Sequence, residues 1–255
     1  MPRFHLPRVS TRRRPARLLS LLAFRDEMRF LPGYFANVVA ELDGVVALDD
    51  GSTDGSAEYV MGRPEVLELI RQPAREPHHW DDACNHRLLV EVARRHRPDW
   101  LLGVDADERL EHDFRARADF EIERAQREGF TAYYVWLREL WGSPTTVRID
   151  GIWGRKQSSR LFECREDHEF HDQRLHGHWA PLNGRLADGS FPSADLIIYH
   201  LRMLHPEDRA ARRDRYNRLD PNREMQAIGY DYLTDETGIE LAPIDPLRSY
   251  RPIPS

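Results

Sequence analysis

Short apolar runs alternate with amphipathic stretches through the first half of the chain. The continuous apolar runs are typical of strands buried on both faces of a sheet. They lie at residues 17–24, 45–49, 66–70 and 100–104. Between and after them, apolar residues recur at three- and four-residue intervals, which predicts helices. We expect helices at residues 27–42, 56–61 (with Ser56 as N-cap), 80–96 and 114–128. This alternation predicts an α/β fold with a mostly parallel, Rossmann-like sheet flanked by helices.

The pattern changes after residue 129. Residues 130–141 are aromatic and strand-like, and shorter strands are expected at 159–162 and 194–200, followed by a charged helix at 206–218. The expected organisation is a basic arm (1–15), a single domain (16–226) made of two halves (16–129 and 130–226), and an irregular, proline-containing tail (227–255). The second half is smaller and mixed in character.

Charge and cysteine content narrow the class of protein. A net charge of −6 argues against a nucleic-acid partner. Two cysteines outside any CxxC spacing fit a reducing compartment, and no apolar run approaches the roughly 20 residues of a membrane span. We therefore expect a cytoplasmic protein. Two interpretations of the arm stay open, namely a solvated tail or peripheral contact with the inner face of an anionic membrane. Lys156 is the only lysine, so the other basic residues are arginines.

Carboxylates follow two of the predicted strands. Asp49 and Asp50 come at the end of one apolar run, and Asp105 and Asp107 come directly after another. Parallel strands present their carboxyl ends at one edge of the sheet, where open α/β sheets bind ligands. Oxygen ligands gathered there are able to hold a divalent cation and leave positions for phosphate oxygens. The alternative is that these aspartates form turns and cap helices.

The strings at these strand ends resemble those of a family 2 glycosyltransferase with the GT-A fold. The matching strings are Leu-Ala-Phe-Arg-Asp-Glu at 22–27, Leu-Asp-Asp-Gly-Ser-Thr-Asp-Gly at 48–55, and Asp-Ala-Asp-Glu at 105–108. The resemblance covers roughly residues 16–205. The form of the third string, with the helix that begins near Trp80 before it, is similar to the bacterial subgroup that acts on lipopolysaccharide core and other surface glycans.

The resemblance implies roles for the matching residues. The first half (16–129) would bind the nucleotide-sugar donor, and the second half (130–226) the acceptor. The implied donor-binding residues are Ala23, Phe24, Arg25, Glu27, Asp49, Asp50, Ser52, Asp82, Arg87, Asp105 and Ala106. Asp107, with Asp105 and His200, would hold Mn²⁺ or Mg²⁺ against the diphosphate. A buried histidine without a metal is the alternative for His200.

The catalytic base is less clearly marked. Four histidines lie between residues 168 and 181, and either a zinc site or a polar loop is consistent with them. Inverting members of the family need a carboxylate that takes the proton of the acceptor hydroxyl. Relatives often carry His-Glu here, whereas this chain has His176-Gly177. The remaining candidates are Asp172, which we favour, and Glu169.

The sequence thus predicts a metal-dependent, inverting glycosyltransferase that moves a sugar from a nucleotide-diphosphate sugar to a saccharide or glycolipid acceptor. Two alternatives compete with it. A nucleotidyltransferase on a similar sheet would need a glycine-rich, basic phosphate-binding loop after the first strand. This chain has Arg25-Asp26-Glu27 at that position, which contains no glycine. A non-catalytic nucleotide-sugar-binding protein would keep the fold without turnover.

Overall fold

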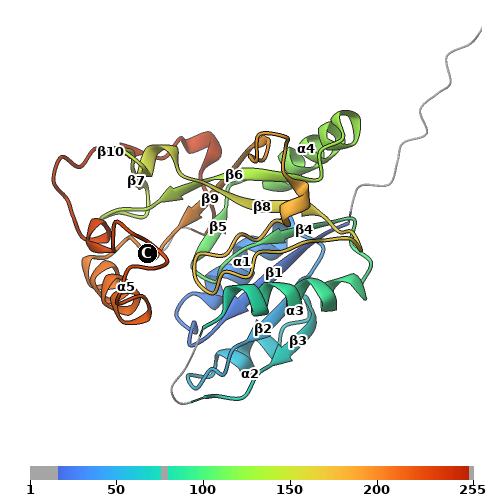
Figure 1. Cartoon of the computed structure of the whole chain (residues 1–255), viewed down its shortest axis with the longest axis horizontal. Helices are drawn as coiled ribbons and strands as arrows, with labels where there is room; N and C mark the ends of the chain where they lie inside the picture. The colour runs from blue at the N-terminus through green and yellow to red at the C-terminus, as the bar shows by residue number, and fades with distance from the viewer. Residues whose placement is uncertain (1–16, 76–79, 253–255) are drawn as a thin grey trace, which may run out of the picture.

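An eight-stranded sheet forms the centre of the protein (Figure 1). The computed structural model describes residues 17–75 and 80–252, so the basic arm predicted at 1–15 lies outside the described residues. The strand order is β3-β2-β1-β4-β8-β6-β9-β5. Helices pack on both faces of this sheet. The predicted α/β architecture is confirmed.

The first half of the chain builds the parallel part of the sheet. Its strands are β1 (Leu18–Phe24), β2 (Val45–Asp49), β3 (Val66–Arg71) and β4 (Trp100–Gly103). β1 pairs in parallel with both β2 and β4, so the carboxyl ends of these strands meet at one edge. All seven residues of β1 are buried, as expected of a strand covered on both faces.

The second half continues the same sheet with mixed pairing. Its strands are β6 (Ala132–Glu139), β8 (Gln157–Glu163) and β9 (Ser193–His200). β8 runs antiparallel to β4, and β9 runs parallel to β6. The short β5 (Glu108–Leu110) pairs with β9 at the edge of the sheet. The two halves are therefore joined through one continuous sheet.

Helices cover the two faces of the sheet in separate layers. They are α1 (Leu31–Glu41), α2 (Ser56–Met61), α3 (Asp82–Arg94), α4 (Phe114–Glu128) and α5 (Pro206–Leu219). Side chains of β1 alternate between the layers, as the pleat of a strand requires. Leu18 and Leu22 belong to the core that contains α1 and α4, whereas Leu19 and Leu21 belong to the core that contains α3.

The C-terminal part of the chain packs beside the second half of the sheet. Residues 227–252, predicted as an irregular tail, include β10 (Leu241–Pro243), which pairs antiparallel with β7 (Thr146–Arg148). Tyr230 and Leu233 enter a core with Trp141 and Trp153. Figure 1 shows this unit, with α5, to one side of the parallel strands.

Two local differences from the sequence prediction affect the site. The helix expected from residue 27 begins at Leu31, with Pro32 in its first turn. Residues before it form a turn that leaves Glu27 free to face the cavity described below. Ser56 was predicted as an N-cap, but Gly55 takes that position with a φ of +91°, which suits glycine. The Ser56 hydroxyl instead accepts a hydrogen bond from the backbone N–H of Glu27 at 2.9 Å.

None of the helices among the described residues has the length and apolar character needed to cross a membrane.

Candidate active site

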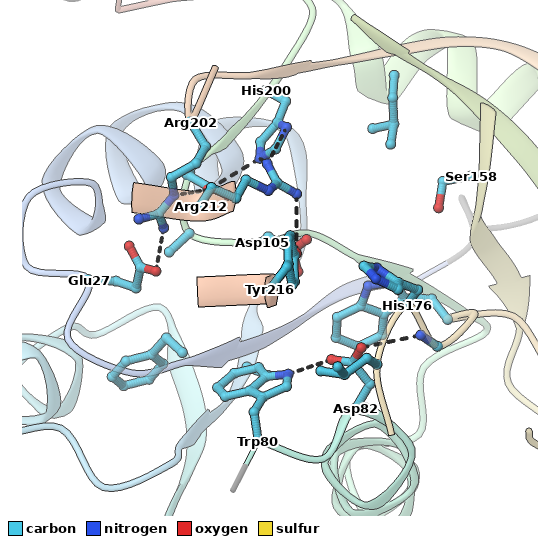
Figure 2. Close-up of a pocket in the computed structure, with 18 of the residues that line it drawn as sticks. Glu27, Trp80, Asp82, Asp105, Ser158, His176, His200, Arg202, Arg212 and Tyr216 are labelled. Atoms are coloured by element: carbon cyan, nitrogen blue, oxygen red, sulfur yellow. Dashed lines mark hydrogen bonds and ion pairs between the residues drawn. The ribbon is translucent and has the colours of Figure 1, made fainter. Parts of the chain in front are cut away.

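A cavity of about 700 Å³ lies at the carboxyl ends of β1 and β4. The turn after β1 and the residues after β4 form one wall. Residues 175–179, the end of β9 and one side of α5 form the others. Figure 2 shows Trp80 and Asp82 at one end of the cavity and His200 with Arg202 at the opposite end. The cavity is therefore built by both halves of the chain.

Arg202 joins two carboxylates at the His200 end. Its Nε lies 2.6 Å from Oδ2 of Asp107, and its Nη2 donates to Glu27 (Figure 2). Burial raises the pKa of Glu27 to about 7, although Arg202 opposes the rise. Burial also disfavours the charge on Asp107, but Arg202 and His200 outweigh it and hold the pKa of Asp107 well below its usual value. Asp107 is therefore ionised at neutral pH.

The register between β5 and β9 explains why His200 meets Asp107. Glu108 pairs with His200 across the two strands, so Asp107 lies next to the histidine. Nε2 of His200 is 3.2 Å from Oδ2 of Asp107, and Nδ1 is 2.5 Å from Oε2 of the buried Glu139. Glu139 also forms an ion pair with Lys156. Although burial opposes it, Glu139 and Asp107 raise the pKa of His200 to about 9.

Asp107 Oδ2 and His200 Nε2 have a separation that would suit two ligands of a divalent cation, but Arg202 Nε (2.6 Å) and Arg212 Nη1 (3.1 Å) contact the same two atoms in this structure. Two ligands each about 2.1 Å from an octahedral ion lie about 3 Å apart, close to the observed separation. Glu139 orients the imidazole through Nδ1, as outer carboxylates do for metal-bound histidines. Within the described ranges no group of three or more His, Cys, Asp or Glu side chains is placed to hold a metal. Phosphate oxygens of a ligand would have to complete the coordination.

Asp105 also lines the cavity. Its Oδ2 is 3.1 Å from Nη2 of Arg160, which also pairs with the buried Glu108 at 2.7 Å. The Asp105 side chain keeps 43% of its surface exposed, so it remains open to a ligand. Burial raises the pKa of Glu108 to about 7, with Arg160 opposing.

The opposite end of the cavity is formed by the start of α3 and the loop around residue 177. Oδ1 of Asp82 accepts a hydrogen bond from Nε1 of Trp80 at 2.5 Å, and Oδ2 accepts one from the backbone N–H of Gly177 at 3.2 Å (Figure 2). His176 has a φ of +60°, an uncommon backbone conformation for a residue other than glycine. Its Nε2 lies 3.2 Å from the hydroxyl of Tyr230.

The structure brings together many, but not all, of the residues that the sequence singled out. Those that line the cavity are Ala23, Phe24, Arg25, Glu27, Asp82, Asp105, Ala106, Asp107, His176 and His200. The others do not line it: Asp49, Asp50, Ser52, Arg87, Glu169 and Asp172. Their proposed roles stay predictions.

The residues that do not line the cavity have local partners. Asp49 accepts a hydrogen bond from the backbone N–H of Ser52 at 2.8 Å, which holds the turn after β2. The Ser52 hydroxyl accepts one from the backbone N–H of Asp26 at 3.0 Å, which ties this turn to the one after β1. Asp172, favoured as the base, is 89% exposed and pairs with Arg87 at 2.6 Å.

Sequence reasoning missed several residues of the cavity. Arg202 follows His200 by two positions, and nothing in its local string marks it. Arg212 and Tyr216 are four residues apart on α5, so one helix face presents both to the cavity. The four-residue spacing of Arg212 and Tyr216 could have indicated a common helix face, but the many charged residues of this helix obscured it. His86 stacks on Trp179 with ring centroids 3.7 Å apart, and only the folded chain brings the two together.

No family model matches the chain. Two uncharacterized proteins, from Mycobacterium tuberculosis and Mycobacterium bovis, are each 26% identical over 226 residues, with 84% of this chain and 54% of their own length covered. The chain thus spans about half the length of these curated relatives. Among solved structures, TarS from S. aureus superposes with a TM-score of 0.50 at 12% identity, covering 85% of this chain and 42% of that one.

A further solved structure shares less of the fold. Glucosyl-3-phosphoglycerate synthase from Mycobacterium tuberculosis, in complex with Mn²⁺ and UDP-glucose, covers 48% of this chain and 44% of its own at 15% identity. Its TM-score of 0.36 adds nothing to the fold assignment. The likeness to TarS supports the GT-A type of fold that the strand-end motifs predicted.

Proposed function

We propose that the chain transfers a sugar from a nucleotide-diphosphate sugar to a hydroxyl of a saccharide or glycolipid acceptor, with inversion at the anomeric carbon and with the aid of Mn²⁺ or Mg²⁺. The observation that carries the proposal is that Asp105, Asp107 and His200 line one cavity at the carboxyl ends of β1 and β4, with Asp107 and His200 in direct contact. Ligands bind at this edge in open α/β sheets. The family resemblance of the same strings supports a nucleotide-sugar donor.

The charges of the cavity suit a diphosphate leaving group. Arg160, Arg202, Arg212 and Lys156 all line it, and guanidinium groups bind phosphate oxygens well. Fixed cations aimed at the bond that breaks lower the barrier, since negative charge grows on the diphosphate as the sugar departs. A divalent cation held by Asp107 and His200, with Asp105 nearby, would add further neutralisation of that charge.

Two alternatives give different products. A nucleotidyltransferase would release pyrophosphate from a nucleoside triphosphate and a sugar phosphate. A non-catalytic binding protein would bind a nucleotide sugar without releasing nucleoside diphosphate. The products, rather than binding, therefore distinguish the three functions.

The experiment is a melting-temperature screen followed by a product assay. UDP-glucose, UDP-N-acetylglucosamine, GDP-mannose and dTDP-rhamnose are each tested with MnCl₂ and with EDTA. A donor that binds the folded state raises the melting temperature. We expect one donor to do so with Mn²⁺ and to release nucleoside diphosphate slowly by transfer to water. Asp107→Asn should lower that release at least 100-fold, whereas Asp113→Asn, an exposed aspartate at the start of α4, should not.

Two results would contradict the proposal. A raised melting temperature with no release of nucleoside diphosphate from any donor would favour a binding protein. Equal release from wild type and Asp107→Asn would remove Asp107 from the site.

A further inference from the structure

The carboxylates that line the cavity differ in their partners. Asp105 and Asp107 are paired with Arg160 and Arg202, and Glu27 shares Arg202. The remaining lining carboxylates are also paired, Asp26 with Arg25 at 3.4 Å and Asp208 with Arg29 at 2.7 Å. Among the described residues, Asp82 has no cationic side chain within ion-pair distance. A carboxylate held by a guanidinium is a weak proton acceptor, because the cation favours its ionised form.

Two neutral donors fix the orientation of Asp82. Trp80 Nε1 donates to Oδ1 and the Gly177 N–H to Oδ2, which uses two of about four acceptor positions on the carboxylate. The others remain available to a hydroxyl. Asp82 lies in the first turn of α3, on the rigid scaffold of the domain. Within residues 17–75 and 80–252, the groups that hold Asp82 in place are these neutral donors, and no ion pair neutralises it.

Gly177 is what allows the loop to approach Asp82. A Cβ added at Gly177 would lie 3.0 Å from the Asp82 Cβ and 3.9 Å from its Cγ. The aspartate thus fills the space that a side chain at position 177 would need. The carboxylate beside Gly177 therefore comes from α3 and not from the loop itself.

We propose that Asp82, which the resemblance implied to be a donor contact, is instead the general base of the transfer reaction, an assignment that rests on the proposed function. The acceptor O–H gives its proton to a free oxygen position of the Asp82 carboxylate. The acceptor oxygen forms a bond with the anomeric carbon, and the bond from that carbon to the diphosphate oxygen breaks. The bonding electron pair leaves on the diphosphate, which departs as nucleoside diphosphate. Asp172, which is exposed and outside the cavity, does not take part.

The surroundings of Asp82 set its pH dependence. Burial raises the pKa of Asp82 above the usual value, the Trp80 and Gly177 hydrogen bonds lower it, Asp105 raises it, and His176 lowers it. The net pKa is raised. Turnover of wild type should therefore fall as pH drops through a value above that of an ordinary aspartate, because the protonated base accepts no proton.

The test compares transfer to water with transfer to azide. Release of nucleoside diphosphate is measured for wild type, Asp82→Asn, Asp172→Asn and the control Asp113→Asn, using the donor and Mn²⁺ from the screen above. Asp82→Asn should lower kcat by about 10²- to 10⁴-fold and abolish the acidic limb of the pH profile. The donor should still raise the melting temperature of Asp82→Asn, and the dissociation constant derived from that shift should stay within a factor of a few of the wild-type value.

Azide bypasses the base because it has no proton to lose. We expect sodium azide to restore turnover of Asp82→Asn at least tenfold and to yield the glycosyl azide, with no such gain in wild type. Gly177→Ala adds a methyl group that presses on the Asp82 Cβ. This variant should also have a lower kcat than wild type, with an unchanged affinity for the donor.

The outcomes separate the two proposals. If wild type releases no nucleoside diphosphate from any donor, the proposed function and the Asp82 assignment both fail. If wild type turns over and Asp82→Asn matches it, or loses turnover that azide does not restore, the Asp82 assignment alone fails. A loss confined to Asp172→Asn would return the base to the exposed loop.

Discussion

His86 should make the stability of the protein depend on pH in a predictable direction. Its imidazole is buried against Trp179, and Nδ1 has no hydrogen-bond partner. Burial lowers the pKa of His86 from 6.5 to about 4. The unfolded chain therefore takes up a proton at a higher pH than the folded chain does. Stability from this group is complete above pH 6.5 and is lost as pH falls through 6.5 towards 4.

The size of the effect follows from the two pKa values. Each pH unit between them corresponds to about 1.4 kcal/mol, so the full interval amounts to about 3 kcal/mol. At pH 5.0, part of the way through the interval, the expected loss is about 2 kcal/mol. His168 also has a pKa lowered to about 4 by burial and contributes in the same direction. A substitution of His86 alone therefore measures how much of the pH-dependent loss of stability comes from His86.

Urea unfolding at pH 7.5 and 5.0 measures this share. His86→Phe keeps a ring against Trp179 and removes the titrating group, so its loss of unfolding free energy on acidification should be about 2 kcal/mol smaller than that of wild type. His112→Gln, at an exposed histidine, should behave like wild type. A difference between wild type and His86→Phe below about 0.5 kcal/mol would refute the reasoning.

Three further predictions concern the cavity and the residues that pack around it. Gly103→Ala places a Cβ 2.1 Å from Cδ2 of Trp179, so urea unfolding should show a loss of about 3 kcal/mol, and an unchanged midpoint would contradict the packing. Arg202→Met removes a cation from the proposed donor site and should weaken nucleotide-sugar binding about 10- to 100-fold by calorimetry, while equal affinity would exclude Arg202 from donor binding. Glu139→Gln removes a carboxylate that raises the pKa of His200, so the NMR titration of His200 should move from about 9 towards 6.5, and a pKa still near 9 would contradict that role.

Burial on both faces made the first half of the fold predictable. β1, β2 and β4 are continuous apolar runs, and the helices between them keep a regular period. β5 was missed because Glu108-Arg109-Leu110 carries two charges in three residues. Local backbone groups bind both charged side chains, and Glu108 is also paired with Arg160, which lies far away along the chain. Partners that are distant along the chain cannot be identified from the residues around β5.

In the site too, residues at strand ends were easier to predict than residues brought together by a loop. Asp105 and Asp107 line the cavity because they directly follow β4, whose carboxyl end lies at this edge of the sheet. The contact between Asp82 and Gly177 was not predictable, since the loop at 168–181 has no periodic pattern and its approach to α3 depends on Gly177. Asp172 was favoured as a nearby carboxylate in sequence, yet it points to Arg87 outside the cavity. Distance along the chain was a poor measure of distance in space.

The single lysine gives this protein an unusual chemical handle. Lys156 lines the cavity with 36% of its side chain exposed and pairs with Glu139. An acylating reagent therefore has one side-chain amine in the entire sequence to modify, besides the amino terminus. A ligand seated in the cavity would shield that amine. The rate at which the peptide that contains Lys156 gains one acyl mass is thus a readout of cavity occupancy, and it needs neither a labelled ligand nor turnover.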